Sequence, residues 1–180
     1  DRELLAALER QWEHTVARRT YLTGGMGARH HDESFGEDWE LPPARAYSET
    51  CAGVASIMVA WRLYLATGRV RYADLIERTF FNVVATAPRA DGRAFFYANP
   101  LHPRGAGPAP DEDAVRPRAS VGARAPWFHA ACCPTNLART LAGWHLYAVT
   151  AGERTLTLLQ YASARVTAEL GDGRRIGVEV

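Results

Sequence analysis

The three cysteines are the residues of this sequence best suited to carry chemistry. They are Cys51, Cys132 and Cys133. An odd number leaves one thiol over, and adjacent cysteines bridge each other only through a strained ring, so a disulfide framework is a poor use of them. Thiols gathered around a metal ion are a better use, because thiolate is the soft ligand that zinc prefers.

The surroundings of each cysteine support a metal site. Cys51 follows Glu49 where a helix is expected to begin, and Cys132 and Cys133 directly precede Pro134, a residue favoured in the first turn of a helix. Free N–H groups and the positive end of the helix dipole lower the pKa of a thiol placed there. Two helix starts would thus supply four ligands. By composition alone, three cysteines buried in a core explain the sequence as well.

Hydrophobic periodicity predicts the elements that must position these residues. Apolar residues at helical spacing predict helices over residues 2–18, from Ser48 or Thr50 to Gly68, over 72–87 and from Pro134 to about 148. A short strand is expected at 94–98, and alternating apolar residues predict strands from about residue 155, with a hairpin at 171–173. We therefore expect a mostly α domain over 1–153 and the first strands of a β domain over 154–180.

Charge and length narrow the class of protein. The 180 residues carry 21 basic and 20 acidic side chains, and this balance argues against a partner that is nucleic acid or a membrane surface. No apolar stretch approaches the roughly 20 residues of a membrane span, so none is expected. Because the sequence starts at Asp1, already inside a predicted helix, we expect it to be the later part of a longer protein.

Seven motifs follow one another in a fixed order along residues 21–136. They are Tyr-Leu-Thr-Gly-Gly-Met-Gly at 21–27, Glu-Ser-Phe-Gly at 33–36, Glu-Leu-Pro at 40–42, Ala-Tyr-Ser-Glu-Thr-Cys-Ala at 46–52, Phe-Phe-Tyr-Ala-Asn-Pro-Leu at 95–101, Trp-Phe at 127–128 and Ala-Cys-Cys-Pro-Thr-Asn at 131–136. Each motif alone is weak. Together they resemble the β-L-arabinofuranosidases of glycoside hydrolase family 127.

The resemblance implies a zinc ion held by Glu49, Cys51, Cys132 and Cys133, with Cys132 also the nucleophile. It implies that Glu33 is the acid/base carboxylate. The implied fold is part of an (α/α)6 toroid, or barrel, followed by the start of a β-sandwich domain. The N-terminal half of the toroid would then be missing, so we expect apolar faces meant for its helices to be exposed.

Other residues flank the expected centre. Trp39, Trp127 and His129 are candidates for substrate binding, since aromatic rings stack on sugar faces. Core packing is the alternative for Trp39. Asn99 and Asn136 suit hydrogen bonds to substrate hydroxyls, and suit a turn or a helix cap equally well.

These observations predict a retaining glycosidase with a zinc-bound cysteine nucleophile. Its substrate would be an oligosaccharide or glycoside, specifically a β-L-arabinofuranoside or a related plant glycan. Cysteines kept reduced for zinc favour the bacterial cytoplasm. Two alternatives remain: a non-catalytic helical carbohydrate-binding or scaffold protein with a structural zinc site, and an inactive gene fragment.

Overall fold

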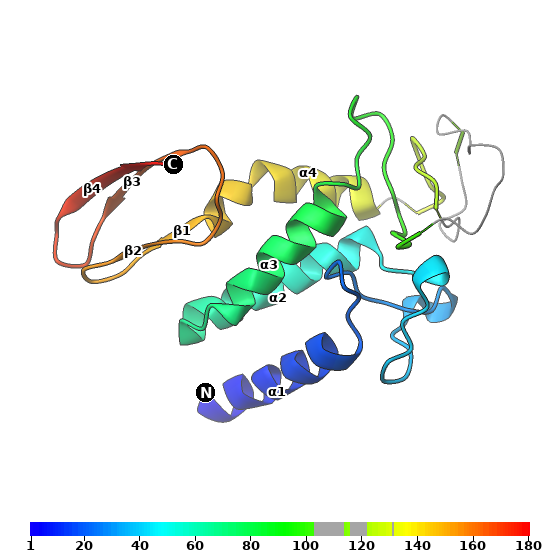
Figure 1. The fold of residues 1–180 in the computed structure, drawn as a ribbon, viewed down its shortest axis with the longest axis horizontal. Helices are drawn as coiled ribbons and strands as arrows, with labels where there is room; N and C mark the ends of the chain where they lie inside the picture. Colours follow the sequence, from blue (N-terminus) through cyan, green and yellow to red (C-terminus); the bar gives the residue numbers. More distant parts are fainter. Residues whose placement is uncertain (103–113, 116–121, 131) are drawn as a thin grey trace. The chain divides into compact units, whose positions relative to one another are not determined.

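The computed structural model describes residues 1–102, 114–115, 122–130 and 132–180 (Figure 1). These residues form two compact units, Asp1–Ala138 and Arg139–Val180. The chain is helical with a small β part, as expected. Residues 99–126 hold six prolines and three glycines without periodicity, which predicts a loop, and most of them lie outside the described residues. The domain boundary expected after residue 153 stays a prediction.

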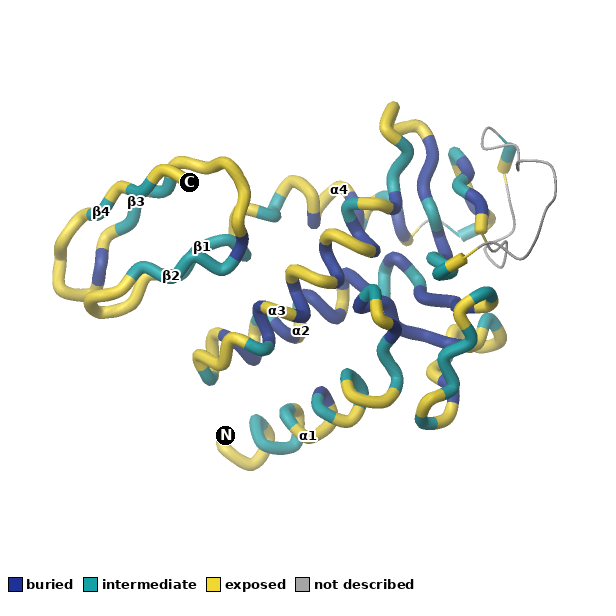
Figure 2. The backbone as a smooth tube through the Cα atoms, viewed as in Figure 1, coloured by how far each residue is buried: buried dark blue, intermediate teal, exposed yellow. Residues whose placement is uncertain are grey.

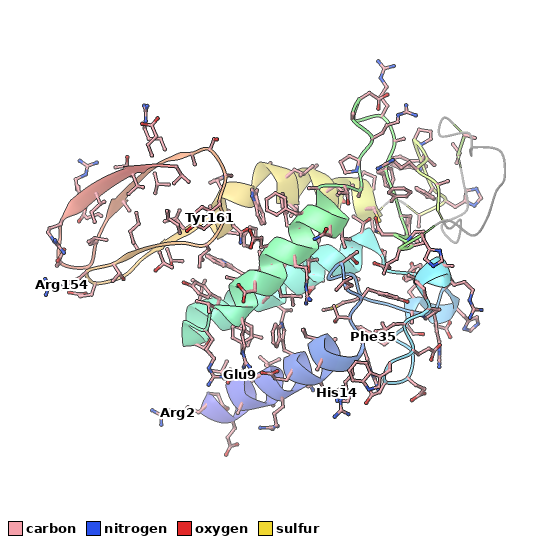
Figure 3. The ribbon with its side chains drawn as sticks, in the orientation of Figure 1. Arg2, Glu9, His14, Phe35, Arg154 and Tyr161 are labelled. Carbon is pink, nitrogen blue, oxygen red and sulfur yellow. The ribbon has the colours of Figure 1, made fainter. Side chains whose placement is uncertain are left out.

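The first helix, α1 (Arg2–Arg18), has the bounds that its apolar periodicity predicts. The Asp1 carboxylate caps it by accepting hydrogen bonds from the first-turn N–H groups. Its buried Trp12 meets the ring of Tyr72 edge-on, with centroids 4.6 Å apart. Glu9, labelled in Figure 3, accepts hydrogen bonds from the Tyr72 hydroxyl (2.7 Å) and from Arg69 (2.6 Å). One face of α1 is thereby fixed against the third helix and the turn before it.

The second and third helices, α2 (Thr50–Thr67) and α3 (Arg71–Thr79), pack against each other as a helical hairpin (Figure 1). Gly68 ends α2 in the left-handed conformation (φ 69°) that glycine adopts most easily. The predicted helix over 72–87 is not a single α-helix. It widens into a π-helical turn, η3 (Phe80–Val84), which buries Phe80, Val83 and Val84 together.

The apolar character of α2 corrects one expectation from the sequence. By length and composition this helix could cross a membrane, although no such stretch was expected. Within the protein, however, 44% of this helix is buried, and core helices of folded domains share its length and apolar composition (Figure 2).

The predicted strand at 94–98 is not a strand. Phe95 forms isolated bridges to Pro88 and Ala125, and Ala98 forms one to Glu49. Because each residue pairs with a different segment, no continuous ladder forms. The N–H and C=O of Phe95 bond those of Ala125 at 3.0 and 3.1 Å, which joins the two segments. The segment therefore connects parts of the chain that lie far apart in sequence.

The last helix, α4 (Cys132–Ala142), starts two residues before the predicted position and places both cysteines in its first turn. The 3-10 turn η4 (Trp144–Tyr147) follows. Strand β1 (Val149–Ala151), earlier than predicted, pairs antiparallel with β2 (Leu156–Leu158), and β3 (Arg165–Glu169) pairs with β4 (Arg175–Glu179). The β3–β4 hairpin turns at the predicted Gly-Asp-Gly, where the Leu170 N–H donates to the Arg174 carbonyl (2.8 Å).

Candidate metal centre

Four ligand atoms from two distant parts of the sequence meet at one point. The side chains of Glu49, Cys51, Cys132 and Cys133 place one oxygen and three sulfurs within 4.8 Å of one another. The Sγ of Cys133 lies 3.4 Å from that of Cys51 and 3.9 Å from that of Cys132. The Cys132 Sγ lies 3.3 Å from Glu49 Oε1. The residues that the sequence proposed as ligands are thus brought together.

The starts of two helices position these side chains. Cys51 is the second residue of α2, and Cys132 and Cys133 are the first two residues of α4. Glu49 precedes α2 in extended backbone (φ −62°, ψ 139°), outside the helical spiral. Because its backbone is not helical, the Glu49 side chain reaches the same point as Cys51 from only two residues away.

Asn99 clamps the turn that carries Glu49. Its Nδ2 donates to the Ser48 carbonyl (2.9 Å) and to Thr50 Oγ1 (3.0 Å), the residues on either side of Glu49. The Thr50 hydroxyl in turn donates to the Phe96 carbonyl (2.7 Å). Of the two interpretations of Asn99, the structure supports the turn.

The glycine-rich segment 24–27 makes room for the turn that carries Glu49. Ser48 is fully buried and has a left-handed backbone (φ 37°). Its N–H donates to the Gly27 carbonyl (2.8 Å), and a Cβ placed on Gly25 would lie 1.9 Å from Ser48 Oγ. Only a residue without a side chain fits there, so Gly25 serves close packing behind the centre.

Two tyrosines connect the cysteine cluster to Glu33. Tyr47 donates a hydrogen bond to Glu33 Oε1 (3.0 Å), and the Tyr97 hydroxyl lies 3.5 Å from the same oxygen. The Tyr97 hydroxyl also lies 3.3 Å from Cys132 Sγ. Glu33, an exposed residue with a left-handed backbone (φ 51°), is therefore linked to Cys132 through one hydroxyl. Sequence reasoning did not single out either tyrosine, although both lie in the motifs that hold Glu49 and Asn99.

The electrostatics of the cluster differ from one group to the next. The contact with Cys133 and the amide of Asn136 hold the pKa of Cys51 below its ordinary value. Burial raises the pKa of Cys132 to about 11, and the contact with Cys51, together with burial, raises the pKa of Cys133 far above its usual range. Burial also raises the pKa of Tyr97, so its hydroxyl stays neutral. The protein groups alone thus resist full ionisation of three neighbouring thiols.

This donor set fits a zinc ion. Structural and catalytic zinc sites use four ligands, and Zn–S bonds of about 2.3 Å place the sulfurs of a tetrahedral site about 3.8 Å apart. The sulfur contacts of 3.4 and 3.9 Å lie close to that spacing. A divalent cation would supply the positive charge that three thiolates and a carboxylate need. Glu49, Cys51, Cys132 and Cys133 can therefore hold a metal ion.

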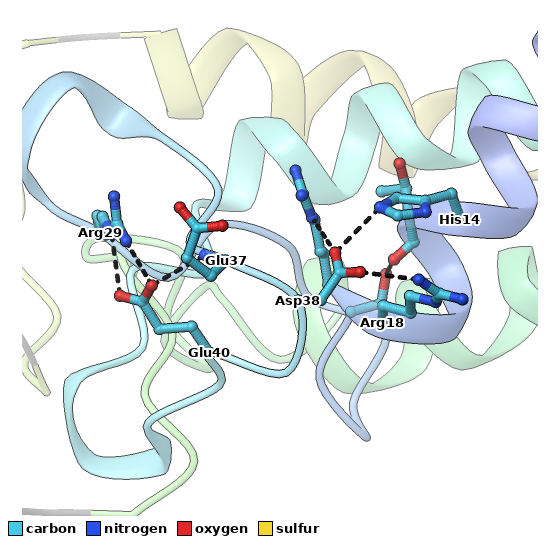
Figure 4. Close-up of polar contacts among 9 residues, drawn as sticks. His14, Arg18, Arg29, Glu37, Asp38 and Glu40 are labelled. Atoms are coloured by element: carbon cyan, nitrogen blue, oxygen red, sulfur yellow. Dashed lines mark hydrogen bonds and ion pairs between the residues drawn. The ribbon is translucent and has the colours of Figure 1, made fainter.

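Two acidic residues near Glu33 in sequence, Asp38 and Glu40, form ion pairs with arginines (Figure 4). Asp38 accepts hydrogen bonds from Arg18 and Arg19, both at 2.9 Å, and these hold its pKa at about 2. The hydrogen bonds from Arg29 likewise hold the pKa of Glu40 at about 2. These ion pairs fix the loop between 29 and 40.

The three proposed substrate-binding residues all lie exposed. Trp39 is 69% exposed, so core packing is not its role. Its backbone N–H donates to the Arg18 carbonyl at the end of α1 (2.9 Å). Trp127 is 49% exposed and His129 is exposed, whereas Phe128 between them is fully buried against Phe95 and Tyr97. Their contact with a sugar stays a prediction.

Comparison with known proteins identifies the family of the chain. The family model for the β-L-arabinofuranosidase GH127 catalytic domain matches residues 1–145. The non-reducing end β-L-arabinofuranosidase of Bifidobacterium longum subsp. longum is 35% identical over 174 residues, which cover 96% of this chain and 26% of that protein.

Solved structures give the same result. A GH127 β-L-arabinofuranosidase from Geobacillus stearothermophilus T6 superposes with a TM-score of 0.86 at 34% identity, over 99% of this chain and 27% of the other. A second GH127 β-arabinofuranosidase superposes with a TM-score of 0.78 at 33% identity, over 93% and 24%. The chain spans about a quarter of the length of these relatives. It belongs to the GH127 β-L-arabinofuranosidase catalytic-domain family.

Proposed function

We propose that the protein containing this chain is a retaining glycosidase that cleaves β-L-arabinofuranosides, with zinc in the four-residue centre and Cys132 as nucleophile. The exposure of Cys132 carries the proposal. Within one cluster Cys133 is fully buried and Cys51 half-buried, whereas Cys132 is exposed. Because four protein ligands fill a tetrahedral site, substrate would have to react at a ligand and not at an open position of the metal, and only an exposed sulfur can be reached. The names of the relatives supply the substrate class.

The first step would form a covalent bond between enzyme and sugar. A bound zinc ion would keep the thiolates deprotonated at neutral pH. The Cys132 Sγ attacks the anomeric carbon while the bond from that carbon to the leaving oxygen breaks. Glu33 donates its proton to the leaving oxygen, which departs as an alcohol.

The second step reverses these roles. Glu33, now a carboxylate, takes a proton from a water molecule whose oxygen attacks the anomeric carbon. The carbon–sulfur bond breaks and the Cys132 thiolate is restored. Two inversions at the anomeric carbon give overall retention of its configuration, as in glycosidases that use a carboxylate nucleophile. The contact of Tyr97 with both Glu33 and Cys132 supports this division of work.

The fold proposal is that the helices form part of an (α/α)6 toroid and the strands begin a β-sandwich, with a domain boundary after residue 153. A groove of about 420 Å³ between α1 and α2 supports the toroid. Leu8, Trp12, Val16 and Val59 line this groove, and Leu8 and Val59 are exposed. Apolar side chains that line an open groove on two neighbouring helices suit a further helix packed there.

Metal analysis together with turnover tests the proposed function. A protein of the relatives' length that contains this chain should bind one zinc ion and hydrolyse an aryl β-L-arabinofuranoside. Cys132→Ser and Glu33→Gln should each lose hydrolysis, while Glu37→Gln, a matched change in the same loop, should keep it.

A native protein without zinc would contradict the proposal, as would full activity of Cys132→Ser. Zinc and sugar binding without hydrolysis at any pH would instead identify a non-catalytic carbohydrate-binding protein.

A further inference from the structure

The amide of Asn136 touches the metal centre from outside its four ligands. Its Nδ2 donates a hydrogen bond to Cys51 Sγ at 3.0 Å. We propose that Asn136 is a positioning residue that fixes Cys51 in place as a permanent metal ligand and so leaves Cys132 as the sulfur free to react. The assignment of Cys132 as the reacting sulfur rests on the proposed function; the effect of Asn136 on metal binding does not.

The geometry follows from one turn of α4. Asn136 lies four residues after Cys132 and three after Cys133, and residues at these spacings share a helix face. From that face the amide reaches across to Cys51 at the start of α2. One turn of α4 thereby supplies two ligands and a hydrogen-bond donor to a third. The two helix starts are joined independently of any ion.

The direction of this hydrogen bond is fixed by chemistry. An amide nitrogen only donates, so the Cys51 sulfur must accept. Such a bond is strongest when its acceptor is charged, as the sulfur of a metal-bound cysteine is, so the amide would fix the Cys51 sulfur at the centre. It also draws electron density from the sulfur, and this lowers the tendency of Cys51 to attack a carbon atom.

The other two thiols have different surroundings. Cys133 is fully buried, so a substrate cannot reach it. Cys132 is exposed, and its Sγ lies 3.3 Å from the Tyr97 hydroxyl, 3.3 Å from Glu49 Oε1 and 3.9 Å from Cys133 Sγ. One sulfur is thus enclosed, one is held by an amide, and one is accessible next to a hydroxyl. This asymmetry assigns Cys51 and Cys133 as ligands that stay on the metal and Cys132 as the sulfur that reacts with substrate.

The two interpretations of Asn136 taken from the sequence do not account for this contact. Asn136 is the fifth residue of α4, past the positions at which a side chain caps a helix start. Substrate binding would not require its amide to lie 3.0 Å from a thiol. Outer hydrogen bonds of this kind orient metal ligands, and their loss costs about 10–100-fold in metal affinity.

The test measures metal binding and the spectrum of bound cobalt. Asn136→Asp keeps the shape of the side chain and removes both N–H donors, and Asn136→Ala removes the group altogether. We expect both variants to bind Zn²⁺ about 10–100-fold more weakly in competition with a chelator. With Co²⁺, the sulfur-to-metal charge-transfer band should move to longer wavelength, because a thiolate without its hydrogen bond gives up electrons more easily.

Asn82→Asp is the matched control. Asn82 is exposed, its Nδ2 donates to the Arg78 carbonyl (2.8 Å), and its loss should change neither measurement. In a Cys51→Ser background, Asn136→Asp should have no further effect on the cobalt band, because the sulfur it acts on is gone. An equal shift in that background overturns the proposal, as does an unchanged band and affinity in the single variants.

Failure of this proposal and failure of the proposed function can be told apart. Loss of zinc affinity and the cobalt shift, found in a protein that hydrolyses no glycoside, support the role of Asn136 in holding Cys51 while contradicting the proposed enzyme. Normal hydrolysis by the unaltered protein, together with an unaltered cobalt band in Asn136→Asp, would support the proposed enzyme and contradict the role of Asn136. A chain that binds neither Zn²⁺ nor Co²⁺ contradicts both.

Discussion

The hydroxyl of Tyr97 lies 3.3 Å from the Sγ of Cys132, at the exposed side of the cysteine cluster. The tyrosine itself is only 2% exposed, and its ring is held edge-on against Phe128, with centroids 5.5 Å apart. A neutral hydroxyl at this position can donate to the sulfur of Cys132 as that sulfur regains its charge when the carbon–sulfur bond breaks in the second step, and a hydrogen bond to a charged group contributes about 1.5–3 kcal/mol.

Tyr97→Phe should therefore slow hydrolysis of an aryl β-L-arabinofuranoside by roughly 10–150-fold in kcat. The ring and its packing are kept, so the melting temperature should change little. Steady-state kinetics and a thermal melt measure the two effects. Tyr161→Phe, at a residue 76% exposed, is the matched control. An unchanged kcat would show that the Tyr97 hydroxyl has no part in the reaction.

The ion pairs of Asp38 predict how stability changes with pH. Its pKa in the folded chain is about 2, below the value of about 3.9 for an unfolded aspartate, because Arg18 and Arg19 donate to it. A lowered pKa means that this stabilisation is present above about pH 4 and is lost as pH falls towards 2. Between about pH 4 and 2 the melting temperature of Asp38→Asn should fall less than that of the unaltered protein. Parallel curves of melting temperature against pH for the two proteins would contradict this.

The contact between Gly25 and Ser48 predicts a cost in stability. Gly25→Ala would place a methyl group 1.9 Å from Ser48 Oγ, and overpacking of this kind costs about 1–3 kcal/mol of unfolding free energy. Denaturant unfolding measures it. Gly177→Ala, with no atom within 4 Å of the new carbon, should be nearly neutral.

A second substitution separates the clash at Gly25 from backbone effects. Ser48→Gly removes the opposing side chain and relieves the left-handed backbone of Ser48. In combination with Gly25→Ala it should recover much of the lost stability. If the double variant is as unstable as Gly25→Ala alone, the loss has another cause.

Local signals predicted two of the helices well. The apolar periodicity over residues 2–18 and the Gly68 stop agree with the observed bounds of α1 and α2. The resemblance also named the four residues that converge in the metal centre. Where an element depends on its own sequence, periodicity and capping were enough.

Features set by distant contacts were not predictable in this way. The segment at 94–98 has the composition of a strand, but its partners lie on three separate segments, so it forms bridges only. The π-helical turn at Phe80–Val84 depends on how that face of the helix packs, which periodicity does not report. The amide of Asn136 and the hydroxyl of Tyr97 find their cysteine partners 85 and 35 residues away in sequence.

The bridge at Ala98 and the clamp at Asn99 have a consequence for the oxygen ligand of the centre. Asn99 holds Ser48 and Thr50, and Ala98 bridges Glu49, so a segment that supplies no ligand fixes the turn that carries Glu49. These contacts join residues that lie 51 and 49 positions apart in sequence. The place of the Glu49 carboxylate is therefore a property of the folded chain and not of the start of α2 alone.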